Sequence, residues 1–264
     1  MNQTNNDYQT RKAFFQRVLT VYGRKPVLEA LQTADLPCHA LHLADSNREE
    51  GVLREILRIA RQRQIPLHYH SRAELARISR NGRQDQGVAA DLLCPHFTSL
   101  GDYLAELPAR PQRLLALDGI SNPQNLGMLI RSAAAGRIDG ILLPSRGCAS
   151  LGPLVIKASA GTVYRAPLLR CEGLPEALRL CREKGFEVCS LRADARESLF
   201  SYRPRGHAVF VLGNETEGVS REVAQLADRG LSIPMRNGVE SLNVAVTASL
   251  IAFAGELTPP ADPG

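Results

Sequence analysis

Three polar, glycine-bearing stretches each follow a hydrophobic run, and their side chains could act together on one substrate. The stretches span residues 117–133, 211–218 and 233–253. In an α/β sheet such loops gather at the carboxyl ends of the strands, where ligands bind. The three stretches therefore predict one composite site. Asn125, Arg131, Ser241 and Asn243 are polar side chains that could line this site.

The third stretch ends in a segment that is apolar on nearly every side, which predicts a largely buried helix beginning near Leu242. Ser241 and Asn243 stand where the first turn of that helix leaves backbone N–H groups unpaired. Taken alone, Ser241 is best explained as a helix N-cap. The two other polar loops favour a role for both residues in the composite site.

The first stretch predicts a helix with one inward face. Asn122 followed by Pro123 is typical of an N-cap and a first helical residue. The inward face repeats at i, i+3, i+4 and i+7 and consists of Leu126, Leu129, Ile130 and Ala133. Arg131 lies off that face. Gly127 costs such a helix about 1 kcal/mol relative to alanine, which suggests a close approach to its backbone.

Several common site types are missing from the sequence. It contains no G-x-G-x-x-G, no P-loop, no G-x-S-x-G and no H-E-x-x-H motif. The six cysteines form no C-x-x-C pair and the six histidines no ligand motif, so reduced thiols and a metal-free protein are expected. No apolar run approaches the roughly 20 residues of a membrane span. The polar N-terminus lacks a signal-peptide core, so a cytoplasmic protein without membrane association is expected.

The positive charge is concentrated in one window. Residues 48–83 contain nine arginines and four glutamates, which alone gives the chain's net charge of +5. A helix with a solvated basic face is the simpler interpretation. A basic module next to a site-bearing module also fits a polyanionic substrate. On that hypothesis the candidate residues for binding a polyanion are Arg24, Lys25, Arg54, Arg58, Arg61 and Arg83.

Strands and helices are expected to alternate in two α/β domains. The predicted divisions are a disordered tail at 1–15, a small α/β domain at 16–96, a linker at 97–112, a parallel-sheet domain at 113–257 and a second disordered tail at 258–264. In the small domain, strands are expected at 39–43, 65–69 and 88–94 and helices at 49–63 and after the capping box Ser71–Glu74. In the second domain, strands are expected at 113–117, 140–143, 186–191, 208–212 and 231–233. The helices of that domain are expected at 124–135, 151–159, 174–184, 221–227 and 242–254.

The three stretches resemble the motifs of the SpoU (TrmH-like) branch of the SPOUT RNA methyltransferases in order and spacing. The matching segments are Asn125–Arg131, Leu212–Gly218 and Ile233–Ala245. Residues 22–27 and 82–88 are similar to that family's L30e-like substrate-binding domain, as in bacterial 23S rRNA guanosine-2′-O-methyltransferases. One departure is Gly136-Arg137, which stands where the family has a small residue followed by glycine. It affects local packing and touches no catalytic position.

The resemblance implies a deep trefoil knot formed around residues 213–243, a homodimer, and S-adenosylmethionine as cofactor. General topology rules argue against knots, so this expectation rests on the resemblance alone. By motif position the cofactor contacts would come from Leu212, Gly213, Ile233, Met235, Leu242 and Asn243. The resemblance implies five candidate catalytic residues, which would surround the methyl group and the target ribose: Asn125, Arg131, Glu215, Ser241 and Asn243.

The implied chemistry leaves the role of the arginine open. A ribose 2′-hydroxyl is a poor nucleophile until its proton is lost or shared, and transfer needs in-line placement. Arginine side chains stay protonated under ordinary conditions, so Arg131 is favoured as a phosphate or alkoxide stabiliser, with base catalysis second. Glu215 could orient Arg131 or bind the nucleoside, and its simpler role is to pair with a helix dipole.

The function expected from the sequence is 2′-O-methylation of a ribose in structured RNA. A guanosine of large-subunit (23S) rRNA is the preferred target, and tRNA is the second candidate. Two further classes stay open: a non-catalytic RNA-binding protein of the same fold, and a SPOUT enzyme that methylates a base nitrogen. The complete set of candidate catalytic residues argues against the first, and the Gly-Asn-Glu and Ser-Leu-Asn patterns argue against the second.

Overall fold

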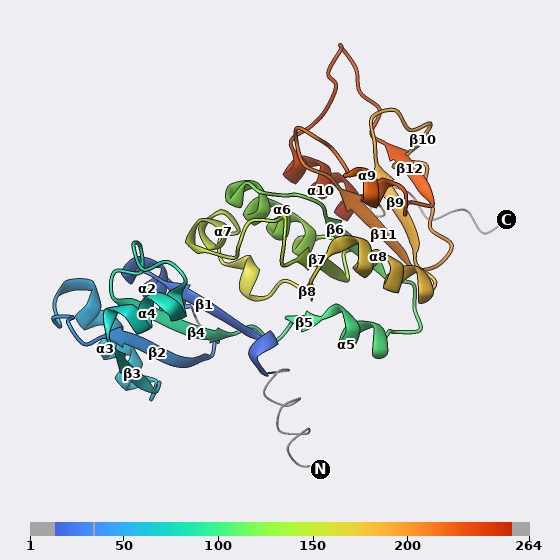
Figure 1. Ribbon diagram of the computed structural model, residues 1–264. Helices are drawn as coiled ribbons and strands as arrows, with labels where there is room; N and C mark the ends of the chain where they lie inside the picture. Colours follow the sequence, from blue (N-terminus) through green and yellow to red (C-terminus); the bar gives the residue numbers. More distant parts are fainter. Residues whose placement is uncertain (1–13, 34, 255–264) are drawn as a thin grey trace. The chain divides into compact units, whose positions relative to one another are not determined.

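A computed structural model of the chain describes residues 14–33 and 35–254. It divides into one unit of residues 1–96 with 151–157 and another of residues 97–150 with 158–264 (Figure 1). Residues 1–13 of the tail expected at 1–15, and the whole of the tail expected at 258–264, lie outside the described residues. Phe14, which the sequence analysis placed in the first tail, packs edge-on against His39 with 4.6 Å between ring centroids.

The first unit contains a four-stranded mixed sheet in the order β1-β4-β2-β3. Its strands are β1 (Val18–Tyr22), β2 (Cys38–Ala44), β3 (Leu67–His70) and β4 (Val88–Leu93). The helices are α2 (Arg24–Gln32), α3 (Gly51–Gln62), α4 (Arg72–Ser79) and most of α7 (Pro153–Ala158). Ser71 and Glu74 form the capping box of α4, as expected. The small α/β domain is therefore confirmed, although β1 was not predicted.

The second unit contains an eight-stranded sheet in the order β10-β12-β9-β11-β6-β7-β8-β5, in which all paired neighbours run parallel. Its strands are β5 (Thr98–Ser99), β6 (Arg113–Leu117), β7 (Gly140–Pro144), β8 (Leu168–Cys171), β9 (Glu187–Leu191), β10 (Glu197–Ser198), β11 (Ala208–Leu212) and β12 (Arg229–Ser232). Its helices are α5 (Leu100–Ala105), α6 (Pro123–Ala135), the short 3₁₀ helix η1 (Thr162–Tyr164), α8 (Leu174–Glu183), α9 (Arg221–Ala224) and α10 (Val244–Phe253). The expected parallel-sheet architecture is confirmed.

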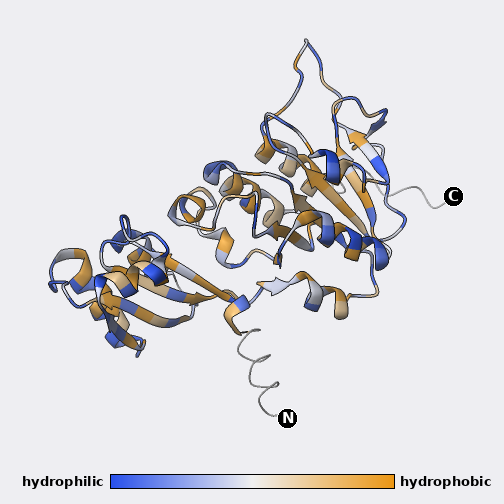
Figure 2. Ribbon diagram, in the orientation of Figure 1, coloured by the Kyte–Doolittle hydropathy of each residue, from blue (hydrophilic) through white to orange (hydrophobic). Residues whose placement is uncertain are grey.

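The central strands of this sheet are apolar throughout because helices cover both faces. Every residue of β7 and β11 is buried, and Figure 2 shows these strands as mostly hydrophobic. Leu114, Val209 and Val211 pack with Leu174 and Leu178 of α8 in one core cluster. This rigid layer fixes the positions of the loops that leave the carboxyl ends of β6 and β11.

The expected linker at 97–112 belongs to the second unit. It holds β5, which pairs with β8, and α5. Phe97, Leu100 and Leu104 are buried, so these apolar side chains anchor the segment. Strand β8 was also not predicted, because Leu168–Cys171 is short and follows a proline without a clear periodic pattern.

Helix α10 packs on α6 at a glycine that departs from the family pattern. A Cβ at Gly136 would lie 2.6 Å from the Cβ of Ala252 and 2.8 Å from its carbonyl oxygen. The amide of Arg137 donates to that same carbonyl over 2.9 Å. Gly136 therefore permits the close approach of α10 to the end of α6. The trefoil knot around residues 213–243 stays a prediction.

The six free cysteines provide a test of the core. Burial raises the pKa of Cys171, Cys181 and Cys189 to about 12 and that of Cys38 to about 11. Because only the thiolate reacts, we expect the native protein to react slowly with iodoacetamide at pH 8 and to label fully once denatured. Mass spectrometry of labelled peptides measures this. Rapid native labelling of these four thiols would contradict the packing.

Candidate active site

The three predicted loops leave the same, carboxyl-terminal edge of the second unit's sheet. They follow β6, β11 and β12, and β11 pairs directly with β6. The amide of Asp118 continues this pairing by donating to the carbonyl of Leu212 over 2.8 Å. The loop after β12, residues 233–243, projects from the body of the unit before α10 begins (Figure 1).

Three of the predicted catalytic residues form one hydrogen-bonded chain across these loops. The Nδ2 of Asn125, in the first turn of α6, donates to Oε1 of Glu215. The Nδ2 of Asn243 donates to Oδ1 of Asn125 over 3.1 Å. Asn125 is half-buried, whereas Glu215 and Asn243 are exposed. One amide, at position 125, therefore connects the loops that follow β11 and β12.

Side-chain caps determine where α6 and α10 begin, and the cap of α10 corrects the expectation for Ser241. Asn122 accepts hydrogen bonds from the amides of Gln124 and Asn125, so it caps α6 as expected. The N-cap of α10 is Asn243, which accepts from the amide of Ala245 over 2.9 Å. The helix thus begins at Val244 and not near Leu242, and Ser241 is an exposed loop residue.

Arg131 lies on α6 and is exposed. Its guanidinium makes no ion pair or hydrogen bond with any residue that the structure describes. Glu215 accepts from Asn125, and no bond between Glu215 and Arg131 is found among the described residues, so a role of Glu215 in orienting Arg131 stays a prediction. A free guanidinium near a site is available for a phosphate or a developing negative charge.

The loop after β11 folds tightly against its own start at Gly213. A Cβ at this position would lie 2.0 Å from the carbonyl carbon of Gly218 and 2.1 Å from the amide nitrogen of Val219. Only glycine lets the two backbone segments come so close. Asn214 and Gly218 also exchange two backbone hydrogen bonds of 2.9 Å each. The predicted cofactor residue Gly213 therefore permits a tight backbone loop at residues 213–219, which is called the backbone cradle below.

The other predicted cofactor residues differ in exposure. Ile233, Met235 and Leu242 are half-buried apolar side chains around the projecting loop. Leu212 is only 2% exposed and belongs to the sheet core, so its side chain cannot contact a ligand and only its backbone could. Sequence reasoning also missed Asp118 and Asn214, which join two of the loops, although both lie within the motif stretches.

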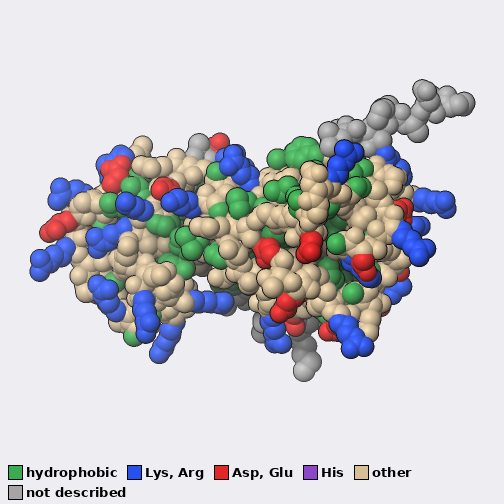
Figure 3. All heavy atoms as spheres, turned by 90° about the horizontal axis from the view of Figure 1, so that it is seen from above, with side chains coloured by type: hydrophobic (Ala, Val, Ile, Leu, Met, Phe, Trp, Pro, Cys, Tyr) green, Lys and Arg blue, Asp and Glu red, His purple; other side chains and the backbone are tan. Residues whose placement is uncertain are grey.

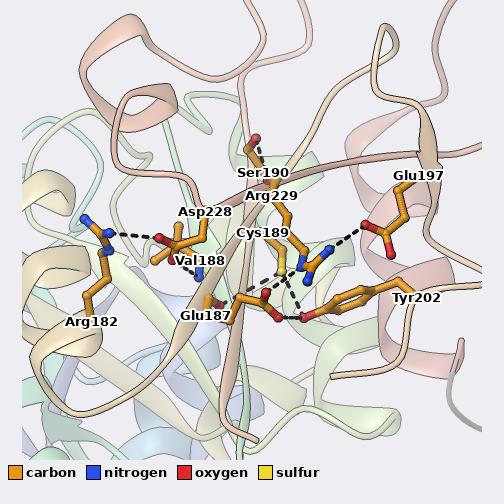
Figure 4. A network of polar contacts seen from close by, with 9 residues as sticks. All are labelled: Arg182, Glu187, Val188, Cys189, Ser190, Glu197, Tyr202, Asp228 and Arg229. Atoms are coloured by element: carbon orange, nitrogen blue, oxygen red, sulfur yellow. Dashed lines mark hydrogen bonds and ion pairs between the residues drawn. The ribbon is translucent and has the colours of Figure 1, made fainter. Parts of the chain in front are cut away.

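A separate polar network lies at the opposite, amino-terminal edge of the sheet (Figure 4). Arg229 donates to Glu187 and, over 3.1 Å, to Glu197, while Tyr202 donates to Glu187 as well. Partial burial opposes ionisation, but the bonds from Tyr202 and Arg229 hold the pKa of Glu187 below its ordinary value. These residues line a pocket of about 760 Å³. Because Arg229 pairs with both glutamates, we assign the network a structural role.

In the first unit, the two segments similar to a substrate-binding domain lie together. The side chain of Asn81 donates to the hydroxyl of Tyr22, and the amide of Arg24 donates to the side chain of Gln86. Figure 3 shows many lysine and arginine side chains over the visible face of this unit, on the left of the view. Among the predicted RNA-binding residues, Lys25 and Arg83 are exposed and make no ion pair with a described residue.

The arginines of α3 are mostly engaged within the domain. Arg58 pairs with Glu55 at 2.7 Å, and Arg61 pairs with Glu49 at 3.1 Å. The Nε of Arg54 donates to the carbonyl of Glu49 over 3.3 Å. These contacts satisfy part of their hydrogen-bonding capacity, so the α3 face is a weaker candidate for phosphate binding than Lys25 and Arg83.

Two kinds of feature were also sought in the described part of the chain. None of its helices is both long and apolar enough to span a membrane. Within the same residues, no group of three or more histidine, cysteine, aspartate or glutamate side chains is placed to hold a metal ion.

Comparison with known proteins finds a matching family for each of the two units. Residues 112–253 match the SpoU rRNA Methylase family, and residues 20–93 match the RNA 2′-O ribose methyltransferase substrate binding family. An uncharacterized tRNA/rRNA methyltransferase of Mycolicibacterium vanbaalenii is 37% identical over 233 residues, which cover 88% of this chain and 74% of the relative. Its counterpart in Mycobacterium leprae is 36% identical over 88% of this chain and 75% of the relative.

The chain belongs to the SpoU rRNA methylase family. As a SpoU-family protein it is an RNA methyltransferase that takes its methyl group from S-adenosylmethionine. Solved structures support the fold of this SpoU-family protein. The AdoMet-bound rRNA methyltransferase from Sinorhizobium meliloti has a TM-score of 0.63 at 22% identity and covers 93% of this chain and 90% of that chain. The SpoU methyltransferase AviRb from Streptomyces viridochromogenes, in complex with AdoMet, has a TM-score of 0.59 at 23% identity, with coverages of 90% and 89%.

Proposed function

We propose that this protein methylates the 2′-hydroxyl of a ribose in structured RNA, with a guanosine of 23S rRNA as the preferred target and tRNA as the second candidate. One observation carries the proposal: the hydrogen-bonded chain of Glu215, Asn125 and Asn243 stands at the ligand-binding edge of a SpoU-family sheet. Arg131 supports it: this residue lies on the same helix as Asn125, and its guanidinium is exposed and has no ion-pair partner within residues 14–33 and 35–254.

The loops at this edge fit the cofactor. Gly213 permits the tight loop after β11, and Ile233, Met235 and Leu242 offer half-buried apolar surface for an adenosine and a methionine chain. S-adenosylmethionine, when bound, supplies an electrophilic methyl group on a sulfonium. Backbone groups of Gly213 and side chains of the 233–243 loop would hold it.

The protein's own residues would then bind and orient the ribose. The Asn125 amide, fixed at both ends by Glu215 and Asn243, can present a rigid polar group to a sugar hydroxyl. Arg131 can bind the neighbouring phosphate or stabilise the oxygen as its proton is shared. The exposed Ser241, on the loop before α10, can reach a nucleotide as the loop adjusts.

The preference for rRNA rests on the N-terminal unit, which matches the RNA 2′-O ribose methyltransferase substrate binding family and whose segments 22–27 and 82–88 resemble those of 23S rRNA methyltransferases. The experiment is to map 2′-O-methyl groups in total rRNA and tRNA from a strain that lacks this gene. We expect one 23S rRNA site to lose its methyl group and to regain it on complementation. Loss of a tRNA methyl group alone would move the target to tRNA, and no loss in either pool would contradict the proposal.

We further propose that Lys25 and Arg83 bind RNA phosphates. Each phosphate contact that is lost lowers the salt dependence of RNA binding by about 1 in log–log slope. The variant Lys25→Gln/Arg83→Gln should therefore bind RNA more weakly and with a smaller slope, with unchanged cofactor affinity. Fluorescence anisotropy at several salt concentrations measures both quantities.

The matched control is Arg58→Gln/Arg61→Gln, which removes the same charge where glutamates already neutralise it. It should change the slope less than the first variant. Arg63 is left intact because its guanidinium donates to the carbonyls of Leu31 and Leu36 over 2.7 and 2.5 Å and holds the fold. Equal slopes for both double variants would contradict the assignment.

The proposal includes a homodimer, supported by an exposed apolar stripe on α10. Val246, Leu250 and Phe253 recur at i, i+4 and i+7, and Val246 and Phe253 are 47% and 37% exposed. A second copy of the chain could cover this stripe with its own. Covering these apolar side chains removes their surface from water, which makes the burial favourable.

We expect Val246→Asp/Phe253→Asp to be a monomer and the unchanged protein a dimer, because each copy would have to bury two carboxylates in the interface. Light scattering after size-exclusion chromatography measures the mass. Leu180→Asp, which adds a charge at an exposed apolar residue of α8, is the matched control and should stay dimeric. A dimeric Val246→Asp/Phe253→Asp protein would overturn the interface, as would a monomeric unchanged protein.

A further inference from the structure

Two side chains hold the loop between β11 and α9 against the residues that follow β6. The Nδ2 of Asn214 donates to the carbonyl of Gly119 over 2.8 Å. At the other end of the loop, the amide of Ser220 donates to Oδ2 of Asp118 over 2.7 Å. Glu215 lies between these two bonds in the chain. The backbone on both sides of its carboxylate is therefore attached to the same dipeptide.

Asn214 uses both ends of its side-chain amide. Its Oδ1 accepts from the amides of Thr216 and Glu217 over 2.8 and 3.3 Å, which shapes the turn within the loop. Its Nδ2 makes the bond to Gly119, which crosses between loops. Asparagine donates and accepts at once, whereas an aspartate would keep the turn and lose the bond between the loops.

Asn214 and Asp118 are both half-buried, and neither contributes to the apolar core of the sheet. What they fix is the position of Glu215, which is itself exposed and whose contact in the described structure is with Asn125. A displacement of about 1 Å at a catalytic group can cost on the order of a hundredfold in rate.

We infer that Asn214 and Asp118 are positioning residues for the methyl transfer: they hold Glu215 in contact with Asn125. The inference rests on the proposed function and adds residues to it. Asp118 acts as an acceptor at the end of the loop, and Asn214 acts as a donor at its start. Together the two bonds hold the ends of the exposed loop in place, and with them Glu215 next to Asn125.

The first arm of the test is Asn214→Asp, which removes only the bond to Gly119. Its matched control is Asn122→Asp, because Asn122 uses its side chain only as an acceptor for two amides of α6. We expect Asn214→Asp to lower kcat about tenfold or more with KM for cofactor little changed, and Asn122→Asp to stay close to the unchanged protein. Asp118→Ala should act like Asn214→Asp, and Asp118→Asn, which still accepts, should restore part of the loss.

The second arm separates positioning from general stability. If Asn214 acts through Glu215, Asn214→Asp should lower kcat little further in a Glu215→Gln background. The same fold-loss in both backgrounds would overturn the inference, as would an Asn214→Asp protein with unchanged kcat. Amide hydrogen exchange gives a readout without activity: Asp118→Ala should deprotect Ser220, while Asn122→Asp should not. An inactive unchanged protein with this exchange pattern would refute the proposed function and leave the two cross-loop bonds standing.

Discussion

Replacing Arg131 with alanine should lower the rate of methyl transfer by on the order of a hundredfold, as when a charge partner of a transition state is lost. The variant should fold, dimerise and bind cofactor almost normally, because Arg131 is exposed and its guanidinium makes no hydrogen bond or ion pair with a described residue. Arg131→Lys keeps the charge and loses the planar fork, so it should recover little if the residue grips phosphate through two bonds.

Single-turnover rates on an RNA fragment that contains the target ribose measure this effect, with thermal melting as the folding control. Arg165→Ala is the matched variant, since Arg165 is also exposed but precedes β8, at the amino-terminal edge of the sheet. It should keep the full rate. If Arg131→Ala methylates as fast as Arg165→Ala, Arg131 has no catalytic role. If Arg131→Ala fails to fold, the role of Arg131 is structural.

The second large effect is expected at Gly213. In Gly213→Ala, the new Cβ would stand 2.0 to 2.2 Å from backbone atoms of Gly218 and Val219, so the loop must move. Because that backbone cradle is the proposed cofactor site, we expect affinity for S-adenosylmethionine to fall about tenfold or more. Isothermal titration calorimetry gives the dissociation constant directly.

The control for this change is Gly206→Ala, where a Cβ would meet no atom within 4 Å. That variant should bind cofactor like the unchanged protein. Hydrogen exchange shows whether the effect of Gly213→Ala is local to the loop. Normal cofactor affinity in Gly213→Ala would exclude this loop from the cofactor site.

The architecture followed from sequence because its signals are local. The buried runs at 113–117 and 208–212 and the cap at Asn122 were predictable, since continuous apolar strands and Asn-Pro helix starts have few alternatives. The site residues Asn125, Glu215 and Asn243 were likewise named from the motif stretches. Their hydrogen-bonded chain was not, because it joins residues up to 118 positions apart.

Other features depend on tertiary contacts that no local pattern reports. Ser241 and Asn243 are both good N-cap residues, and only the path of the loop decides that Asn243 caps α10. The segment 97–112 was expected to be a linker, yet its buried Phe97 anchors it in the second unit. From the sequence, Glu215 could have bonded to Arg131, whereas in the structure it accepts a hydrogen bond from Asn125.

The most direct measurement of the central claim is the chemical position of the transferred methyl group. Purified protein would be incubated with methyl-labelled S-adenosylmethionine and RNA from the deletion strain, and the RNA then hydrolysed in alkali. A 2′-O-methyl blocks attack of that oxygen on the neighbouring phosphate, so the account predicts label in an alkali-resistant dinucleotide, at a rate that Arg131→Ala lowers. Label released in a mononucleotide with a methylated base, or no transfer to RNA, would contradict it.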